Sequence, residues 1–136
     1  MARELTTHGT TALNEQLRIT VHDEPGQGNA CHKYKVWPKE LDTFDVCSDP
    51  KRGGRLVRAC LDIQFQDGPI AESGVNGISN EALLAIVQDR LEGFQSGKFA
   101  CVENQEALDA VKKALSALQS RTLRRIACGT EGTNQI

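Results

Sequence analysis

The spacing of apolar residues in the second half of the chain predicts two amphipathic helices. After residue 103, apolar or half-apolar side chains recur at alternating steps of three and four, which aligns them on one helix face: Leu108, Val111, Leu115, Leu118 and Thr122. Residues 80–95 carry a similar face, made of Leu83, Leu84, Val87, Leu91 and Phe94. Ser79 or Asn80 is a good N-cap for this earlier helix, and Gly93, Ser96 and Gly97 are expected to break it. The pattern therefore predicts an antiparallel helical hairpin.

The first half of the chain shows the period-two alternation of half-buried β-strands. Apolar and polar side chains alternate in three segments, residues 17–21, 31–36 and 61–65. A turn sequence at residues 23–28 joins the first two segments, so we expect them to form a β-hairpin. Residues 70–75 are predicted to add a short strand that pairs back onto the sheet.

These elements predict an α+β fold, in which a small N-terminal antiparallel β-sheet is followed by a C-terminal antiparallel helical hairpin. We expect a flexible N-terminus over residues 1–13 and a single domain over residues 14–136. Within that domain, residues 14–78 form the β part, and residues 79–136 form the helical hairpin and the C-terminal tail.

The composition is that of a globular chain with few large side chains for its core. Of 136 residues, 39% are hydrophobic and 4% aromatic, so aliphatic faces must supply the core, and a partner subunit would enlarge it. The net charge of −2 and the pI near 5.9 argue against binding of polymeric nucleic acid. No apolar run reaches the ~18 residues that span a membrane. Residues 1–13 lack the segments of a signal peptide, so we expect neither membrane insertion nor secretion.

The cysteines are scattered along the chain without a CxxC pair, at Cys31, Cys47, Cys60, Cys101 and Cys128. This arrangement indicates neither a disulfide framework nor a zinc knuckle, and it favours a reducing cytoplasm. Cys31 and His32 are adjacent, and neighbouring residues of a strand point to opposite faces, which is poor geometry for binding one metal ion. We therefore expect no metal and no cofactor.

Charge is polarised along the chain. Residues 61–111 contain nine acidic and two basic residues, whereas residues 112–136 contain five basic residues and one acidic residue. Within the closing helix, acidic residues come first and basic residues last, an order that complements the helix dipole and needs no function to explain it. Arg121 and Arg125, however, lie four residues apart and flank Thr122, so we expect both at the edge of the apolar stripe. Because adjacent guanidiniums repel, an anionic ligand or a carboxylate partner is expected there.

Residues 37–58 contain two prolines and are expected to form an irregular excursion, with Phe44 or Val46 returning to the core. Within it, Arg52, Arg55 and a lysine surround two glycines, which suits either an anion-binding loop or a solvated hairpin turn. A second basic and glycine-rich segment lies in the tail. Together the two segments supply the candidates for a second anion site: Arg52, Arg55, Arg124, Gly129, Thr130 and Thr133.

Several motifs follow one another in an order that resembles a known family. They lie in residues 61–70, 74–77, 85–95, 99–104 and 129–133, together with the turn at residues 23–26. In these segments the chain is similar to the phage anti-Thoeris sponge proteins, whose helical hairpin is shared with a phage anti-CBASS sponge. The tail departs from the pattern, because residues 128–134 lack an arginine and a histidine that relatives commonly carry. This departure weakens the case for a second nucleotide site.

The resemblance implies a non-catalytic phage protein that evades bacterial immunity. Members of the family bind signalling nucleotides made by immune enzymes and withhold them from their effectors. Their ligands are isomers of glycocyclic ADP-ribose (a cyclic ADP-ribose) and, in some members, cyclic di- or trinucleotides at separate sites. They form homo-oligomers, as dimers that can combine into hexamers, and they would act in the cytoplasm of the infected bacterial host.

The resemblance also implies a ligand-binding set, namely Phe94, Asn104, Arg121 and Arg125. Phe94 would stack on a base, Asn104 would hydrogen-bond a base edge or a ribose hydroxyl, and the arginines would grip a diphosphate. Structural alternatives exist for individual residues. Phe94 would serve equally as a core residue, Asn104 as a helix cap, and Gly129 as a helix terminator.

Two other classes of function stay open on the sequence. A hydrolase of the same nucleotides would need a general base, a metal cluster or an activated nucleophile. No carboxylate pair stands out, and the histidines are scattered, at His8, His22 and His32, so no catalytic residue is predicted. A structural or adaptor protein would use the hairpin to oligomerise and the arginines to bind carboxylates of a neighbour.

Overall fold

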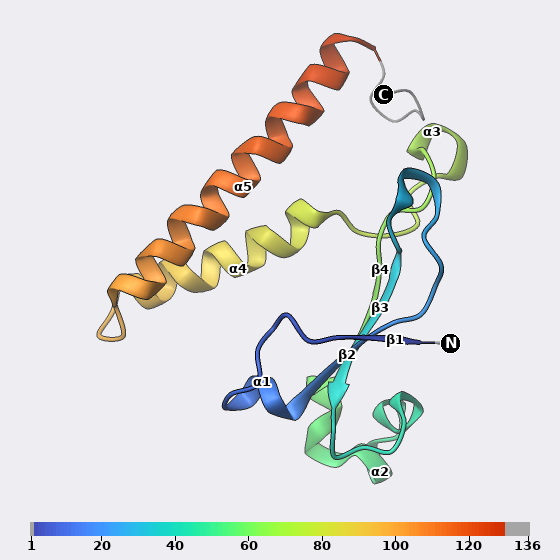
Figure 1. Ribbon diagram of the computed structural model, residues 1–136, viewed down its shortest axis with the longest axis vertical. Helices are drawn as coiled ribbons and strands as arrows, with labels where there is room; N and C mark the ends of the chain where they lie inside the picture. Colours follow the sequence, from blue (N-terminus) through green and yellow to red (C-terminus); the bar gives the residue numbers. More distant parts are fainter. Residues whose placement is uncertain (1, 130–136) are drawn as a thin grey trace. The chain divides into compact units, whose positions relative to one another are not determined.

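The computed structural model describes residues 2–129, and the chain divides into two compact units, Met1–Asp67 and Gly68–Ile136. The first unit is built on a four-stranded antiparallel β-sheet, and the second on a pair of long helices (Figure 1). This architecture confirms the predicted α+β fold, with the sheet first and the helical hairpin last. That residues 14–136 behave as a single domain stays a prediction.

The strands follow one another across the sheet in chain order, each antiparallel to the next. The strands and the helical turn that precedes β2 are β1 (Arg3–Leu5), α1 (Leu13–Gln16), β2 (Leu17–Val21), β3 (Lys33–Pro38) and β4 (Leu61–Gln64). Ile19 lies opposite Val36, and Val21 lies opposite Tyr34. These apolar side chains therefore share one face of the sheet, as the period-two alternation predicts.

The N-terminal segment forms an edge strand that the sequence analysis did not predict. β1 pairs with β2, with Arg3 opposite Val21 and Leu5 opposite Ile19. The expectation that residues 1–13 take no regular structure is therefore wrong for this segment. The edge of β2 presents backbone N–H and C=O groups that need partners, and a short segment without apolar alternation can satisfy them. Hydrophobic periodicity does not detect such a strand.

The opposite face of the sheet carries polar side chains that contact one another. Arg18 lies 3.8 Å from Glu4 in an ion pair, and its guanidinium lies 5.1 Å from the ring centroid of Trp37. Trp37 Nε1 donates a hydrogen bond of 3.2 Å to Thr20 Oγ1, and Thr20 is buried. These contacts link side chains of β1, β2 and β3 on one face.

The excursion after β3 folds into short helical segments around a core of its own. These segments are η2 (Phe44–Ser48), α2 (Pro50–Gly53) and η3 (Gly54–Ala59). Leu41, Val46 and Cys47 form the buried cluster, and Trp37 and Phe44 pack against it. The predicted return of Phe44 and Val46 to a core is confirmed.

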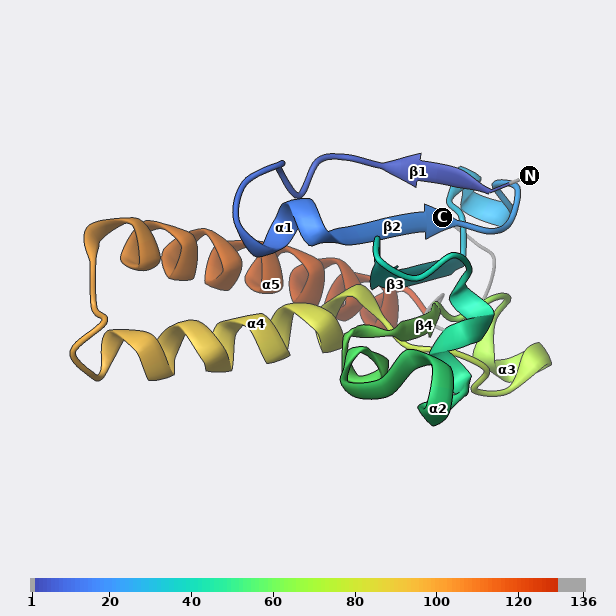
Figure 2. The ribbon, with the colours of Figure 1, turned by 90° about the horizontal axis from the view of Figure 1, so that it is seen from below.

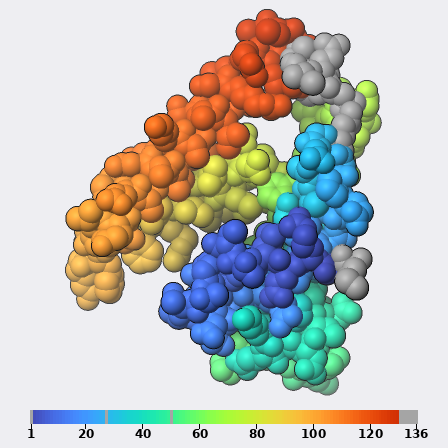
Figure 3. Space-filling model, viewed as in Figure 1, coloured from blue at the N-terminus to red at the C-terminus, as the bar shows by residue number. Residues whose placement is uncertain are grey.

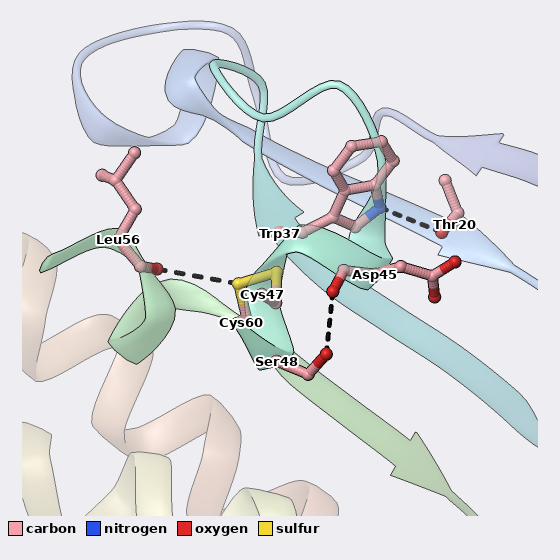
Figure 4. Close-up of a disulfide and its surroundings, with 7 residues drawn as sticks. All are labelled: Thr20, Trp37, Asp45, Cys47, Ser48, Leu56 and Cys60. Carbon is pink, nitrogen blue, oxygen red and sulfur yellow. Dashed lines mark hydrogen bonds between the residues drawn. A yellow bond between two sulfur atoms is a disulfide. The ribbon is translucent and has the colours of Figure 1, made fainter. Parts of the chain in front are cut away.

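A disulfide bond joins Cys47 to Cys60 and cross-links this excursion (Figure 4). Their Cα atoms are 5.8 Å apart, which is within the usual range for a disulfide. The expectation of no disulfide is therefore wrong for this pair. The two cysteines lie 13 residues apart and meet only because the helical segments between them fold back, so their spacing gives no sign of the bond.

A short helical turn, α3 (Ile70–Ser73), opens the second unit where a strand is predicted. The strand over residues 70–75 is therefore wrong. Pro69 precedes the turn, and its carbonyl accepts hydrogen bonds from the N–H groups of Glu72 and Ser73. Gly74 then ends the turn with a φ of +67°, a conformation that glycine adopts without strain.

The predicted hairpin is formed by α4 (Asn80–Gln95) and α5 (Val102–Ala127), which lie side by side and antiparallel (Figures 1 and 2). Ser79 caps α4 by accepting a hydrogen bond of 3.1 Å from the N–H of Ala82. At the closed end of the hairpin, Gln95 Oε1 accepts from the N–H of Cys101 at 3.0 Å. No helix in the described part of the chain, residues 2–129, has the length and apolarity to cross a membrane.

Burial along the hairpin confirms the apolar stripe of α5 and divides the predicted face of α4. On α5, Leu108 is buried, and the rest of the stripe is half-buried. On α4, the less exposed positions include Leu84, Gln88, Leu91 and Gln95, again at steps of four and three. The other predicted residues belong to a second line, here called the outer stripe, made of Leu83, Val87, Arg90 and Phe94.

Candidate functional site

Phe94 and Asn104 lie together at the closed end of the hairpin. Phe94 is in the last turn of α4, and Asn104 is in the first turn of α5. The residues next to them, Gln95 and Gln105, are joined by a side-chain hydrogen bond of 3.2 Å. The hairpin thus brings an aromatic ring and a carboxamide to the same end.

The structure argues against the alternative roles of Phe94 as a core residue and of Asn104 as a helix cap. Phe94 is 39% exposed, so it is not an ordinary core residue. The cap of α5 is Cys101, whose Sγ accepts a hydrogen bond of 3.4 Å from the N–H of Asn104. Because Asn104 lies inside the helix and Cys101 caps it, the side-chain carboxamide of Asn104 is not required as an N-cap.

Arg121 and Arg125 lie near the other end of α5 and have different surroundings. Arg121 is exposed, whereas Arg125 is only 8% exposed and continues the apolar stripe beyond Thr122. The expectation that both arginines sit at the edge of the stripe therefore fits Arg121 better than Arg125. Both also lie in the last two turns of α5, where cations complement the helix dipole.

One copy of the chain does not bring all four predicted ligand residues together. Asn104 and Arg121 are 17 residues apart in the continuous helix α5. At 1.5 Å per residue, this separation is about 26 Å along the helix axis. Phe94 and Asn104 therefore form one half of the candidate site, and Arg121 and Arg125 form the other half at a distance that one nucleotide does not bridge.

The candidates for a second anion site fall in both units. Arg52 in α2 and Arg55 in η3 are exposed and belong to the first unit, and because residues 50–53 are helical, the hairpin-turn interpretation is wrong. Arg124 is exposed in the last turn of α5. Gly129 has a φ of +72°, and its N–H donates to the carbonyl of Ile126, which agrees with its interpretation as a helix terminator. Thr130 and Thr133 lie outside the described residues.

The pair of side chains that most resembles a nucleophile and its base is Thr20 and His22. Thr20 Oγ1 lies 2.6 Å from His22 Nε2 and also accepts the Nε1–H of Trp37. The hydroxyl hydrogen of Thr20 is thus available for His22, which favours a neutral imidazole. Burial, and then the charge of Lys35, lower the pKa of His22 below its ordinary value. Because Thr20 is 7% exposed, this arrangement is a structural network rather than an accessible catalytic pair.

A further polar cluster is centred on Asp23. Its carboxylate accepts the N–H of His32 at 2.8 Å and the N–H of Lys33 at 3.1 Å. Although burial opposes the shift, these donors hold the pKa of Asp23 below its ordinary value. His32 Nδ1 lies 3.5 Å from the same carboxylate, so the cluster closes the loop between β2 and β3. Within residues 2–129, no group of three or more metal-ligating side chains is suited to hold an ion.

Two features of the hairpin were missed by the sequence analysis. The guanidinium of Arg90 lies 5.5 Å from the ring centroid of Phe94, one helical turn away. On α5, small residues form an exposed line with acid and base at its ends, here called the alanine face: Glu103, Ala107, Ala110, Ala114, Ala117 and Arg121. Both features follow the three-and-four spacing of a helix face, so the same test could have found them had it included charged and small residues.

The fold and these half-sites define an α+β protein whose candidate binding groups are carried on a C-terminal helical hairpin. The family model described as Acb2/Tad1, hairpin domain, matches residues 59–123. The protein named Thoeris anti-defense 1 from Bacillus phage SBSphiJ7 is 36% identical to this chain over 115 residues, which cover 79% of this chain and 81% of the relative. The chain therefore belongs to the Thoeris anti-defense 1 family, and the resemblance drawn from its motifs is confirmed.

Proposed function

We propose that this protein is a phage anti-defence protein that binds immune signalling nucleotides, foremost glycocyclic ADP-ribose, and withholds them without cleaving them. The name of its relative, Thoeris anti-defense 1, supports the anti-defence role. The observation that carries the nucleotide assignment is the pair of half-sites on the hairpin, an aromatic and amide end and a guanidinium end. On this proposal the protein acts in the cytoplasm of the infected host, needs no cofactor and has no catalytic residue.

The distance between the half-sites supports a site shared by two copies. Since about 26 Å of helix separates Asn104 from Arg121 in one chain, a ligand that touches both must take them from different copies. An antiparallel pairing of two α5 helices brings Asn104 of one copy near Arg121 and Arg125 of the other. A two-fold axis then creates two equivalent sites for each dimer.

The alanine face supports this antiparallel pairing of α5 helices. Its residues are exposed, and small side chains allow two helices to approach closely. In an antiparallel pair centred on Lys112, Ala107 meets Ala117 of the partner copy and Ala110 meets Ala114. The same register places Glu103 against Arg121 at both ends, so the face is complementary to itself. A guanidinium has five N–H donors, and Arg121 can therefore serve Glu103 and a phosphate together.

Each ligand residue has a definite role in such a shared site. Phe94 stacks on a purine, and Asn104 hydrogen-bonds a base edge or a ribose hydroxyl. Arg121 and Arg125 of the other copy grip the diphosphate with charge-assisted hydrogen bonds. None of these steps breaks a bond in the ligand, so the bound nucleotide is released unchanged when the protein unfolds.

Calorimetry with glycocyclic ADP-ribose tests the proposal. We expect binding at micromolar protein and one ligand for each chain, because each dimer has two sites. After heat denaturation, chromatography should recover the ligand unaltered. Absence of binding, or recovery of a cleaved product, would overturn the proposal.

A structural or adaptor role is the second candidate, supported by the exposed alanine face and by the exposed residues Val87 and Phe94 of the outer stripe. The variant Arg121→Ala separates the two roles, with Lys113→Ala of the same helix as its control. Loss of nucleotide binding in Arg121→Ala, with binding retained by the wild type and the control, supports sequestration, whereas dissociation to monomers with no ligand bound by the wild type supports the adaptor role. Arg121 is preferred to Arg125 for this test because truncating a buried guanidinium also disturbs packing.

A further inference from the structure

Arg90 occupies one side of the ring on which the proposed base stacks. Its guanidinium carbon lies 5.5 Å from the ring centroid of Phe94, which is within the range of about 6 Å for a cation–π contact. Arg90 is exposed, and the structure records no ion pair between it and a carboxylate in residues 2–129. No carboxylate of the described residues therefore competes with an anion for its N–H groups.

Arg90 also interrupts an otherwise apolar line of residues. In the outer stripe of α4, Leu83, Val87 and Phe94 are apolar, and Val87 and Phe94 are 44% and 39% exposed. A fourth apolar residue at position 90 would complete a helix-packing seam. The placement of a cation there, against the one aromatic ring of the stripe, has no evident packing benefit beyond the contact with Phe94.

The helix surface next to Phe94 is open at Gly93. Gly93 lies in the last turn of α4 next to Phe94, and a Cβ atom added to it would meet nothing within 4 Å. Glycine within a helix is less favourable than alanine, and no neighbouring atom requires it. A ligand beside Phe94 would therefore meet no neighbouring atom at the position of Gly93.

We propose that Arg90 is a further ligand-binding residue, which contacts a phosphate of the nucleotide whose base stacks on Phe94. This inference rests on the proposed function and narrows its ligand to nucleotides whose phosphate lies close to the stacked base. Arg90 supplies positive charge from the same copy as Phe94, whereas Arg121 and Arg125 supply it from the other copy. The diphosphate is thus held from both sides of the shared site, and a neutral nucleoside is discriminated against.

The test compares Arg90→Lys with Arg90→Met, using glycocyclic ADP-ribose as the probe in calorimetry at low and high salt. Lysine keeps the positive charge, whereas methionine keeps the apolar stem that packs on the ring. We expect Arg90→Met to weaken binding by about tenfold, the usual effect of losing a hydrogen bond to a charged group, and to reduce the salt dependence of the affinity. Arg90→Lys should retain most of the affinity.

The matched control is Lys98→Met, because Lys98 lies over the ring of Phe99 at 5.6 Å near the same end of the hairpin. This variant should bind the probe as the wild type does. Unchanged affinity in Arg90→Met, or equal losses in the lysine and methionine variants, would overturn the role of Arg90 while leaving the proposed function in place. A wild-type chain that binds no nucleotide would overturn both.

Discussion

At the scale of single residues, His22 shows how a local network sets a pH dependence. The hydroxyl of Thr20 lies 2.6 Å from Nε2, and burial followed by the charge of Lys35 lowers the pKa of His22 from its ordinary value of 6.5. The unfolded chain therefore binds a proton at a higher pH than the folded chain does. The stabilising contribution of neutral His22 is complete above pH 6.5 and is lost as the pH falls through the lowered value.

We predict that the free energy of unfolding of the wild type decreases between pH 7.5 and pH 5. Urea titrations at a series of pH values, followed by the fluorescence of Trp37, measure this change. His22→Gln should show a smaller decrease over the same range, because glutamine does not titrate. A variant that keeps the full pH dependence would assign the effect to other groups.

Single residues also show what the sequence can predict about the candidate site. The helix positions of Phe94, Asn104 and Arg121 follow from three-and-four spacing, and their exposure or half-burial agrees with roles in binding. The burial of Arg125 was not predicted, because a helical wheel does not show what covers a position at the end of a stripe. The contact of Arg90 with Phe94 was missed because only apolar residues were counted on that face.

At the scale of elements, helices and strands that are stabilised by their own sequence were predicted, and those that depend on a distant partner were not. α4 and α5 were predicted closely because their own sequences carry the cap and the helical period. β1 was missed because its pairing partner, the edge of β2, is what makes it a strand. α3 was predicted as a strand because a segment of four residues is too short to show a period, and its flanking Pro69 and Gly74 fit a turn or a strand end equally.

The Cys47–Cys60 disulfide should stabilise the excursion that it closes. Replacing both cysteines by serine is expected to cost about 3 kcal/mol, from the entropy of a loop of this length. Trp37 packs against the cluster that contains Cys47 and is the only tryptophan in the chain, so its fluorescence reports on this region. Urea unfolding followed by fluorescence should shift to lower denaturant, while Cys101→Ser, at an exposed position, should not shift it. Coincident transitions in the wild type and the double variant would contradict this prediction.

The alanine face leads to a prediction about the pairing of α5 helices. Glu103→Arg and Arg121→Glu should each weaken dimerisation, because each places like charges opposite one another in the antiparallel register. The double variant with both changes should recover the dimer but not nucleotide binding, since Arg121 is also a ligand residue. Sedimentation velocity measures the association, and calorimetry measures the binding.

A charge reversal away from the alanine face is the control for this prediction. Lys112→Glu changes the net charge by the same amount as Arg121→Glu and lies on another side of α5. It should leave the oligomer unchanged. Equal dissociation by Lys112→Glu would show that overall charge rather than the register of Glu103 and Arg121 governs association.

At the scale of the whole molecule, the length of α5 decides how the site must be built. The separation of Asn104 from Arg121 could be predicted from the sequence, because both residues were predicted in one uninterrupted helix. About 26 Å between them follows from the helical rise alone. The family resemblance implies that Phe94, Asn104, Arg121 and Arg125 line one pocket. The continuous helix α5 shows that a single chain holds these residues in two separate half-sites.

Mixing two inactive variants tests the shared site directly. Phe94→Ala and Arg121→Ala should each abolish binding, because each damages both sites of its own dimer. In a mixed dimer, one site receives both substitutions and the other receives neither, so one intact site returns. With random exchange of subunits, about a quarter of the wild-type sites should be recovered by the two-fold symmetry of the pairing.

Calorimetry of the equilibrated mixture measures this fraction. A mixture of Phe94→Ala with Asn104→Ala is the control, since two variants of the same half-site cannot complement each other. Recovery in that control would place Phe94 and Asn104 of one site in different copies, and no recovery in the test mixture would place the four residues in a single chain or in different sites. Either result would overturn the antiparallel arrangement.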